Sequence, residues 1–331
     1  MKLLVLGGTL FLGRHVVETA VARGHEVTIF NRGRTNPALY SDVERLHGDR
    51  GGDLHALQGR RWDAVVDTSA ALPRWVRETA RVLAGGVGHY TFVSTCSVYA
   101  DVAHPGVDEA APVHELADET VEEIHDGATY GALKALCERE AERAFPGRAL
   151  AIRPGLIVGP HDDSGRFAYW VHRIARGGAI LAPEPRGQPV QFLDARDLAE
   201  WILDMAEARA TGVYNATGPR EQMTIGQLLD AMVSAVATDA RLVWVDEAFL
   251  VQNGVEAWTD LPLWLAPNTH PGLAGFLSFD VGRALAAGLR FRPLADTIQA
   301  TLDKAEPTTA AGLSAAREAE LLGAWQRSEA A

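Results

Sequence analysis

Cysteine is scarce in this chain: its 331 residues include only Cys96 and Cys137. Two cysteines form neither a disulfide framework nor the ligand cluster of a structural metal site, so we expect no bound metal and a reducing compartment. No apolar run reaches the roughly 18 residues that a membrane-spanning helix needs, and no signal peptide is recognisable. These absences predict a soluble, cytoplasmic protein without a membrane partner.

Basic residues are also fewer than acidic ones. The 31 Lys and Arg against 43 Asp and Glu give a formal net charge of −12, which disfavours non-specific binding to the phosphate backbone of nucleic acids. Hydrophobic residues make up 47% of the chain, enough for a sizeable core, and the length is typical of about two domains. The expected partner is a small molecule rather than a nucleic acid.

What the sequence does contain is a strand, a glycine-rich turn, a helix and a second strand at its beginning. Residues 2–6 are apolar, helical spacing follows the turn from Phe11 to Gly24, and residues 26–30 are rich in β-formers. A helix that begins directly after a buried strand directs free N–H groups and the positive end of its dipole at a ligand above the turn. This predicts the first βαβ unit of a dinucleotide-binding fold, although a turn that binds nothing has the same pattern. The turn residues expected to contact the dinucleotide are Gly7, Thr9, Leu10, Phe11, Leu12 and Gly13.

The end of the second strand indicates which dinucleotide binds. Asn31 lies 18 residues beyond Gly13, close to the spacing of about 20 at which an acidic residue usually binds the adenosine ribose. Arg32 and Arg34 follow it. Because a guanidinium pairs with a 2′-phosphate that a carboxylate would repel, we expect Asn31, Arg32 and Arg34 to contact NADP. NAD is the alternative if both arginines are merely solvated.

Further cofactor contacts are expected where the next strands end, because ligands of open α/β sheets bind at the carboxyl ends of strands. Asp49 follows a third strand and either accepts from the adenine amino group or serves only as a turn residue. Small residues follow the fourth strand, residues 62–67, and let a cofactor pass close. The contacts expected from these positions are Asp49, Arg50, Thr68, Ser69, Ala70 and Pro154.

A tyrosine and a lysine share one face of a helix expected over residues 130–144. Tyr130 and Lys134 are four residues apart. We expect the ammonium to lower the phenol pKa from its usual value of about 10, so that the phenol can act as a general acid or base near neutral pH. A fifth strand, residues 89–93, ends in the hydroxyl-rich residues 94–97, which are candidates for substrate hydrogen bonds.

The rest of the sequence predicts a second, smaller lobe. Asp194 and Asp197 have the spacing of a helix N-cap and its first turn, and beyond about residue 220 the apolar residues lose clean periodicity. We expect a dinucleotide-binding domain over 1–165 with a return segment at about 190–218, a substrate lobe over 166–189 and 219–305, and a linker with a C-terminal helix over 306–331.

Together these motifs resemble the extended short-chain dehydrogenase/reductase family, of the NAD(P)-dependent nucleotide-sugar epimerase/dehydratase type. The resemblance runs from the glycine turn to about Leu294 and implies an α/β fold: a Rossmann-type, doubly wound parallel sheet with a smaller C-terminal substrate lobe. It also implies that Thr95, Tyr130 and Lys134 are catalytic and that the protein is a homodimer. The matching positions are Gly7, Thr9, Leu10, Gly13, Thr95, Val98, Tyr99, Tyr130, Lys134, Arg153, Pro154, Gly159, Pro160, Asp194 and Asp197.

The positions that depart from the family pattern limit the reactions and substrates that we expect. Leu10 stands where the family usually has its middle glycine, as in the atypical branch that includes the chloroplast stem-loop RNA-binding proteins. Cys96 and Ser97 replace the Asp-Glu pair of the sugar dehydratases, which argues against dehydration. Residues 156–158 are apolar and lack the asparagine that nucleotide-sugar enzymes usually place there, which argues against a nucleotide diphosphate substrate.

These observations predict an NAD(P)-dependent oxidoreductase acting on an alcohol–carbonyl pair, with sugar-like substrates included. Tyr130 would pass a proton to or from the substrate oxygen, Thr95 would hold that oxygen, and Lys134 would hold the nicotinamide ribose. A sugar epimerase that retains its cofactor uses the same residues and stays open. An alternative of another class is a non-catalytic Rossmann-type protein associated with RNA. Substrate contacts are expected from Cys96, Ser97, His161 and Arg166.

Overall fold

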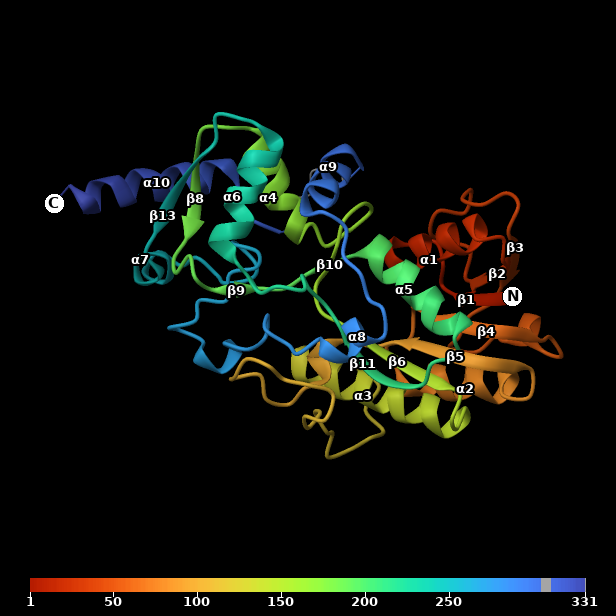
Figure 1. Cartoon of the computed structure of the whole chain (residues 1–331). Coiled ribbons are helices and arrows are strands. Elements are labelled where there is room, and N and C mark those ends of the chain that lie inside the picture. The colour runs from red at the N-terminus through yellow and green to blue at the C-terminus, as the bar shows by residue number, and fades with distance from the viewer. Residues whose placement is uncertain (305–310, 331) are drawn as a thin grey trace.

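The computed structural model describes residues 1–304 and 311–330, and its centre is a seven-stranded parallel sheet (Figure 1). The strand order is β11-β6-β5-β4-β1-β2-β3. The chain therefore reverses direction across the sheet between β1 and β4, the switch point at which doubly wound sheets bind ligands. The strands are β1 (Lys2–Leu6), β2 (Glu26–Asn31), β3 (Glu44–His47), β4 (Trp62–Asp67), β5 (Val87–Val93), β6 (Ala149–Pro154) and β11 (Gly212–Ala216).

Helices cover both faces of this sheet because its central strands are apolar on both sides. Alternate residues of β1 enter different cores: Leu3 and Val5 pack with α1 and α5, whereas Leu4 and Leu6 pack with α2 and α3. This two-sided burial is the pattern of a parallel sheet, and it confirms the predicted Rossmann-type fold. The helices are α1 (Phe11–Ala22), α2 (Pro73–Leu83), α3 (Gly127–Ala144) and α5 (Ala195–Glu207).

A second hydrophobic core, centred on Trp170 and Trp264, belongs to the lobe at the other end of the molecule. Its two-stranded parallel pair, β8 and β13, lies against α10 and the neighbouring helices. The lobe elements are α4 (Arg166–Ala175), β8 (Ala179–Pro183), α6 (Ile225–Val236), β13 (Arg241–Val245), α7 (Glu247–Gln252), α9 (Leu294–Lys304) and α10 (Ala315–Glu329). The domain boundaries stay a prediction, and the expected linker falls almost entirely outside the described residues.

The return segment joins the lobe to the sheet. α5 packs on α1 and β11 pairs with the edge strand β6. Asp194 is the N-cap of α5, as predicted, and accepts from the Arg196 backbone N–H at 2.8 Å. Asp197 instead accepts from the backbone N–H and Nε of Arg292, which ties α5 to the segment before α9.

Short elements complete the chain. Two-residue strands form the pairs β7 (Ile157–Val158) with β10 (Leu193–Asp194), and β9 (Pro189–Val190) with β12 (Met223–Thr224). Single turns lie at His55–Leu57, Cys96–Val98 and Pro271–Leu273, and α8 spans Gly282–Ala286. Over residues 1–304 and 311–330, no helix is long and apolar enough to cross a membrane.

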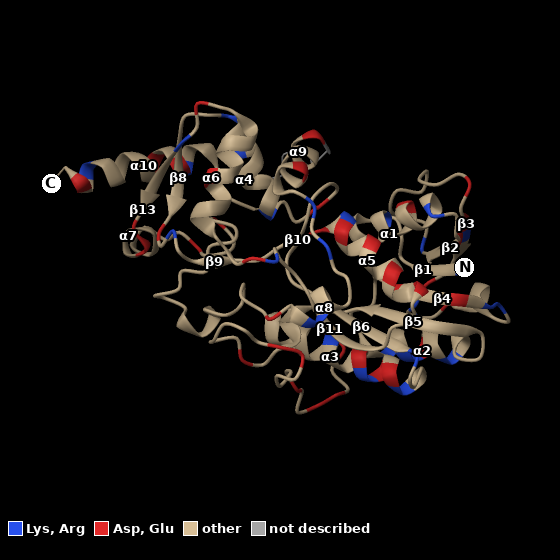
Figure 2. Ribbon diagram, viewed as in Figure 1, with Lys and Arg blue, Asp and Glu red and all other residues tan. Residues whose placement is uncertain are grey.

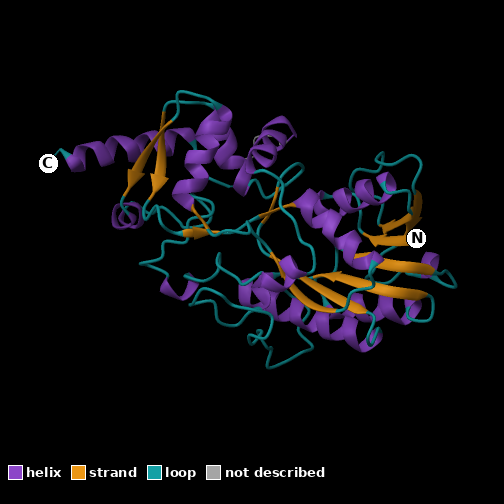
Figure 3. Cartoon of the chain, in the orientation of Figure 1, coloured by secondary structure: helices purple, strands orange, loops and turns teal. Residues whose placement is uncertain are grey.

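The acidic segment between β5 and α3, residues 101–126, is not a free surface loop throughout. Figure 2 shows its acidic residues in the loops beside α3, and its first part is tied to the lobe by backbone hydrogen bonds. Gly275 donates to Val102 at 2.8 Å, Gly106 to Ser278 at 2.6 Å and Asp280 to Val107 at 3.0 Å. The first part of this segment therefore lies against residues 275–280 of the lobe, and Figure 3 shows the segment as a loop.

Candidate active site

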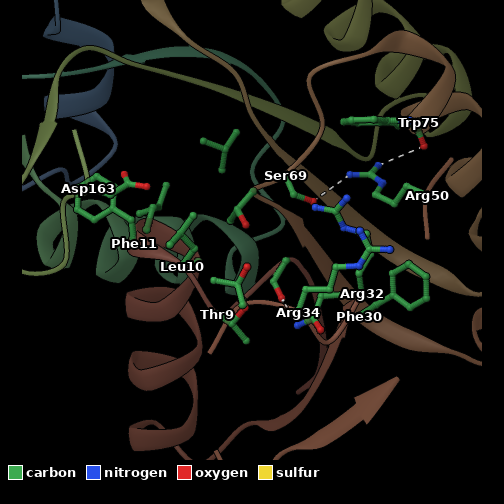
Figure 4. A pocket seen from close by; sticks show the side chains of 18 of the residues that line it. Thr9, Leu10, Phe11, Phe30, Arg32, Arg34, Arg50, Ser69, Trp75 and Asp163 are labelled. Carbon is green, nitrogen blue, oxygen red and sulfur yellow. Dashed lines mark hydrogen bonds between the residues drawn. The ribbon is translucent and has the colours of Figure 1, made fainter. Parts of the chain in front are cut away.

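A cavity of about 530 Å³ runs along the carboxyl ends of the sheet strands (Figure 4). Its walls come from elements on both sides of the switch point between β1 and β4, where the fold predicts a ligand. They consist of residues 7–13, 30–35 and 48–50 together with Thr68, Ser69, Trp75, Val93, Ser94, Tyr130, Lys134, Pro154, Ile157 and Asp163.

The glycine turn is shaped for a close ligand. Gly7 and Gly8 have φ values of +109° and +89°, which a side chain would strain. A Cβ on Gly13 would lie 2.9 Å from the backbone nitrogen of Gly8, so Gly13 allows the helix to approach the turn. Leu10, at φ −132°, has ordinary extended backbone and needs no glycine. Because Leu10 is the N-cap of α1 and makes no capping hydrogen bond, the first N–H groups of α1 are available to an anion.

The residues after β2 divide into one structural residue and two exposed cations. The Asn31 side chain donates to the Gly7 carbonyl and accepts from the Gly33 N–H, both at 2.9 Å. It therefore holds the turn, and because Asn31 also lines the cavity, its expected contact with the cofactor stays a prediction. Arg32 and Arg34 are exposed, line the cavity, and form no ion pair with any described residue.

Arg50 lines the cavity, but its guanidinium already pairs with a carboxylate of the protein. Its guanidinium makes a two-point ion pair with Asp67 at 2.6 and 2.7 Å, and the Tyr90 hydroxyl donates to the same carboxylate at 2.6 Å. Burial alone would raise the pKa of Asp67, but the ion pair with Arg50 keeps this pKa below its usual value. Arg50 therefore forms a buried ion pair as well as lining the cavity, and its expected contact with the cofactor stays a prediction. Asp49 lines the cavity and also accepts from the Gly51 N–H at 2.8 Å, so both roles considered for it fit.

Two of the three predicted catalytic residues, Tyr130 and Lys134, line the other half of the cavity from α3, whereas Thr95 does not line it. The Thr95 side chain lies near enough to Tyr130 to lower the pKa of its phenol, and its hydroxyl accepts from the Ser97 N–H at 3.1 Å. The Lys134 ammonium donates to the carbonyls of Ala70 at 2.8 Å and Val93 at 2.7 Å, which joins α3 to the ends of β4 and β5.

The expected effect of Lys134 on Tyr130 is wrong for this structure. Burial raises the pKa of the Tyr130 phenol, and the nearby Thr95 side chain only partly offsets that rise. Burial also lowers the pKa of the Lys134 amine, to about 8. The ammonium faces two backbone carbonyls and the Phe92 ring, 4.2 Å from its centroid, instead of the phenol. The Tyr130 phenol is therefore protonated at neutral pH.

The four residues expected to contact substrate do not line this cavity. Cys96 is 2% exposed, and its thiol donates to the Arg153 carbonyl at 3.1 Å. His161 lines a separate cavity of about 510 Å³ behind α1, where its ring lies 5.8 Å from that of His15. The Arg166 guanidinium lies over the Trp258 ring at 5.4 Å. Ser97 belongs to the turn that follows Thr95. Their expected contacts with substrate stay a prediction that this cavity does not support.

Ser94 belongs to the hydroxyl-rich segment expected to bind substrate; it lines the cavity, and its hydroxyl is buried without a described partner. Other lining residues escaped the sequence analysis. Trp75 lies in the first turn of α2. Asp163 follows the Gly-Pro turn next to His161, and only the path of the loop decides which of these residues enters the cavity.

A free helix N-terminus, a glycine turn and a cavity across the switch point define a dinucleotide-binding protein of the Rossmann type. Residues 3–217 match the model of the NAD dependent epimerase/dehydratase family, and the chain belongs to that family. This confirms the family resemblance, while the assignment to its atypical branch stays a prediction.

Two curated relatives and one solved structure illustrate the likeness. The chain is 33% identical over 186 residues to a 2-alkyl-3-oxoalkanoate reductase of Stenotrophomonas maltophilia, covering 49% of this chain and 53% of the relative. It is 23% identical over 240 residues to the chloroplast stem-loop binding protein of 41 kDa b of Arabidopsis thaliana, covering 66% and 59%. The matches thus span little more than half of these relatives. The fold resembles the Bordetella bronchiseptica enzyme WbmH in complex with NAD+, with a TM-score of 0.63, 19% identity and coverage of 91% and 97%.

Proposed function

We propose that the chain is an NADP-dependent oxidoreductase that reduces a carbonyl group to an alcohol. The observation that carries this proposal is the single cavity that joins the glycine turn to Tyr130 and Lys134. A protonated phenol is the form needed to supply a proton to a carbonyl oxygen, and the raised pKa keeps Tyr130 in that form. The S. maltophilia relative is named as a reductase, which supports reduction of a carbonyl group rather than oxidation of an alcohol.

The residues present fit a dinucleotide. The N-terminus of α1 and the glycine turn would hold its pyrophosphate, Arg32 and Arg34 its 2′-phosphate, and Lys134 the hydroxyls of its nicotinamide ribose. When bound, the cofactor supplies the hydride. Tyr130 supplies the proton to the substrate oxygen, and Thr95, close to the phenol, orients it.

The substitution Tyr130→Phe tests the proton step. It keeps the ring and removes the hydroxyl, so we expect kcat to fall by roughly 10²–10⁴-fold with little change in NADPH affinity. The measurement is NADPH oxidation with a panel of ketones, alongside NADPH binding by fluorescence. A variant as active as the parent contradicts the proposal. The stoichiometry of NADPH consumption distinguishes a reductase from an epimerase. A reductase consumes one NADPH per product molecule, whereas an epimerase turns over without net consumption of its cofactor.

The two exposed arginines test the cofactor preference. Because each guanidinium would form a charge-assisted hydrogen bond only with a 2′-phosphate, we expect Arg32→Ala with Arg34→Ala to weaken NADPH binding by about 10- to 100-fold and to leave NADH binding nearly unchanged. Parallel titrations of both cofactors measure this. Equal losses for NADPH and NADH would assign the arginines to another role.

A further inference from the structure

The cavity carries opposite charge at its two ends. Arg32 and Arg34 follow β2 and Arg50 follows β3, whereas Asp163 lies at the far end beside Phe11 (Figure 4). Asp163 is exposed, and it forms neither an ion pair nor a hydrogen bond with any residue in the described part of the chain. Its carboxylate is therefore free to act on whatever occupies that end.

Asp163 lies at the end of the cavity opposite the three arginines, which is the end that the nicotinamide would occupy if Arg32 and Arg34 bind the 2′-phosphate. β2 and β3 lie on one side of the switch point, and β4, β5 and β6 lie on the other. Lys134 is held at the ends of β4 and β5, and Pro154 ends β6. Ile157 lines the cavity from β7, and the chain then passes through residues 159–165 to α4 of the lobe. Asp163 thus approaches from the lobe side, opposite the sheet.

Within residues 1–304 and 311–330, neither of the cations nearest this end pairs with Asp163. The Lys134 ammonium is 5% exposed and donates to two backbone carbonyls. Arg166 is only three residues away in sequence, but it lies over Trp258 and outside the cavity wall. The remaining lining residues at this end, Val93, Ser94, Tyr130, Pro154 and Ile157, are apolar or carry a hydroxyl.

We propose that Asp163 is a specificity-determining residue that excludes anionic substrates, so that the enzyme reduces carbonyl compounds with no anionic group near the reacting carbon. This rests on the proposed reductase function. The substrate class is an uncharged or cationic ketone or aldehyde, and 3-oxoacids and nucleotide diphosphates are rejected. At about 6 Å and an effective dielectric constant of about 40, repulsion between two carboxylates corresponds to about a tenfold loss in kcat/KM.

The test compares two probes that share a ketone and differ in charge: ethyl acetoacetate and acetoacetate. The parent enzyme is expected to prefer the ester. Asp163→Asn, which keeps the shape and removes the charge, is expected to raise kcat/KM for acetoacetate about tenfold relative to the ester. Asp163→Glu should retain the preference. Glu18→Gln is the matched control, because Glu18 loses the same charge but lies on α1 beside the second cavity.

The outcomes separate the two proposals. If the enzyme consumes NADPH with these ketones but the ester-to-acid ratio is the same in Asp163→Asn and the parent, the role of Asp163 is overturned and the reductase function stands. If NADPH neither binds nor is consumed, the reductase function itself fails. If NADPH binds but neither probe turns over, the ratio is read from binding of butyramide and butyrate to the NADP-loaded enzyme by saturation-transfer NMR. An unchanged ratio there also overturns the proposal.

Discussion

Lys134 is a charged side chain that the fold buries almost completely. It is 5% exposed, and the cost of burying its ammonium is offset by hydrogen bonds to the Ala70 and Val93 carbonyls and by the face of the Phe92 ring. Asp67 supports this arrangement, since its carboxylate accepts from the N–H groups of Ser69 and Ala70 at 3.1 and 3.2 Å. The ammonium is thus positioned by the turn that follows β4.

Because burial lowers the pKa of Lys134 to about 8, NADPH affinity should depend on pH. The ammonium is present below that pH and is lost as the pH rises through it, so we expect NADPH binding to weaken by about tenfold between pH 7 and 9.5. Fluorescence titration at several pH values measures this. In Lys134→Met, which cannot titrate, affinity should be low and constant. A flat profile for the parent would contradict the role of Lys134.

Residue spacing predicted some of the site and not the rest. Tyr130 and Lys134 could be identified because a helix fixes the relation between positions four apart. Cys96 and His161 could not be placed. The first faces inward because a single turn follows Thr95, and the second has a positive φ of 68° that directs it behind α1. Such local reversals leave no periodic signal in the sequence.

At the scale of elements, α3 is held closely against the turn at Cys96–Val98. A Cβ on Gly131 would lie 2.1 Å from the Ser97 carbonyl oxygen, so only glycine allows this approach. Since Tyr130 precedes Gly131 and Thr95 precedes the turn, the same contact sets the distance between the two hydroxyls that we propose to be catalytic.

The substitution Gly131→Ala should separate these two elements. We expect a loss of stability of about 1–3 kcal/mol from overpacking and a fall in kcat of up to about 10²-fold from the displaced phenol. Gly127→Ala is the matched control in the same helix, since its Cβ would meet nothing within 4 Å; it should change stability by less than about 1 kcal/mol. Urea unfolding and NADPH oxidation report the two effects. Equal behaviour of both variants would refute the close-packing argument.

Long elements were predictable and short ones were not. Residues 62–67 were expected as a strand and residues 11–24 as a helix, and the structure has β4 and α1 at those positions. α3 begins three residues earlier than expected, because Asp126 caps it by accepting from the Thr129 N–H at 2.7 Å. The pairs β7 with β10 and β9 with β12 have two residues per strand, too few to show a period.

At the scale of the whole molecule, the C-terminal helix stabilises the lobe. α10 lies at the end of the molecule away from β1 and β2 (Figure 1). Although α10 carries many charged residues, its Glu318 is only 4% exposed. The Glu318 carboxylate accepts from Arg173 Nε of α4 at 2.5 Å and from the Leu181 N–H of β8 at 3.1 Å. One buried carboxylate thus joins three elements of the lobe.

Removing this charge should destabilise the lobe without altering the cofactor cavity, which lies over the sheet. Because Glu318→Gln leaves the buried Arg173 guanidinium without its counter-charge, we expect a loss of about 3–5 kcal/mol in the free energy of unfolding. The matched control is Glu320→Gln in the same helix, whose partner Arg317 is partly exposed; exposed pairs contribute less than about 1 kcal/mol. Urea denaturation followed by tryptophan fluorescence measures both. NADPH affinity should be unchanged in either variant, since neither residue lines the cavity. If Glu318→Gln is no less stable than Glu320→Gln, the ion pair with Arg173 is not what holds α10 against the lobe.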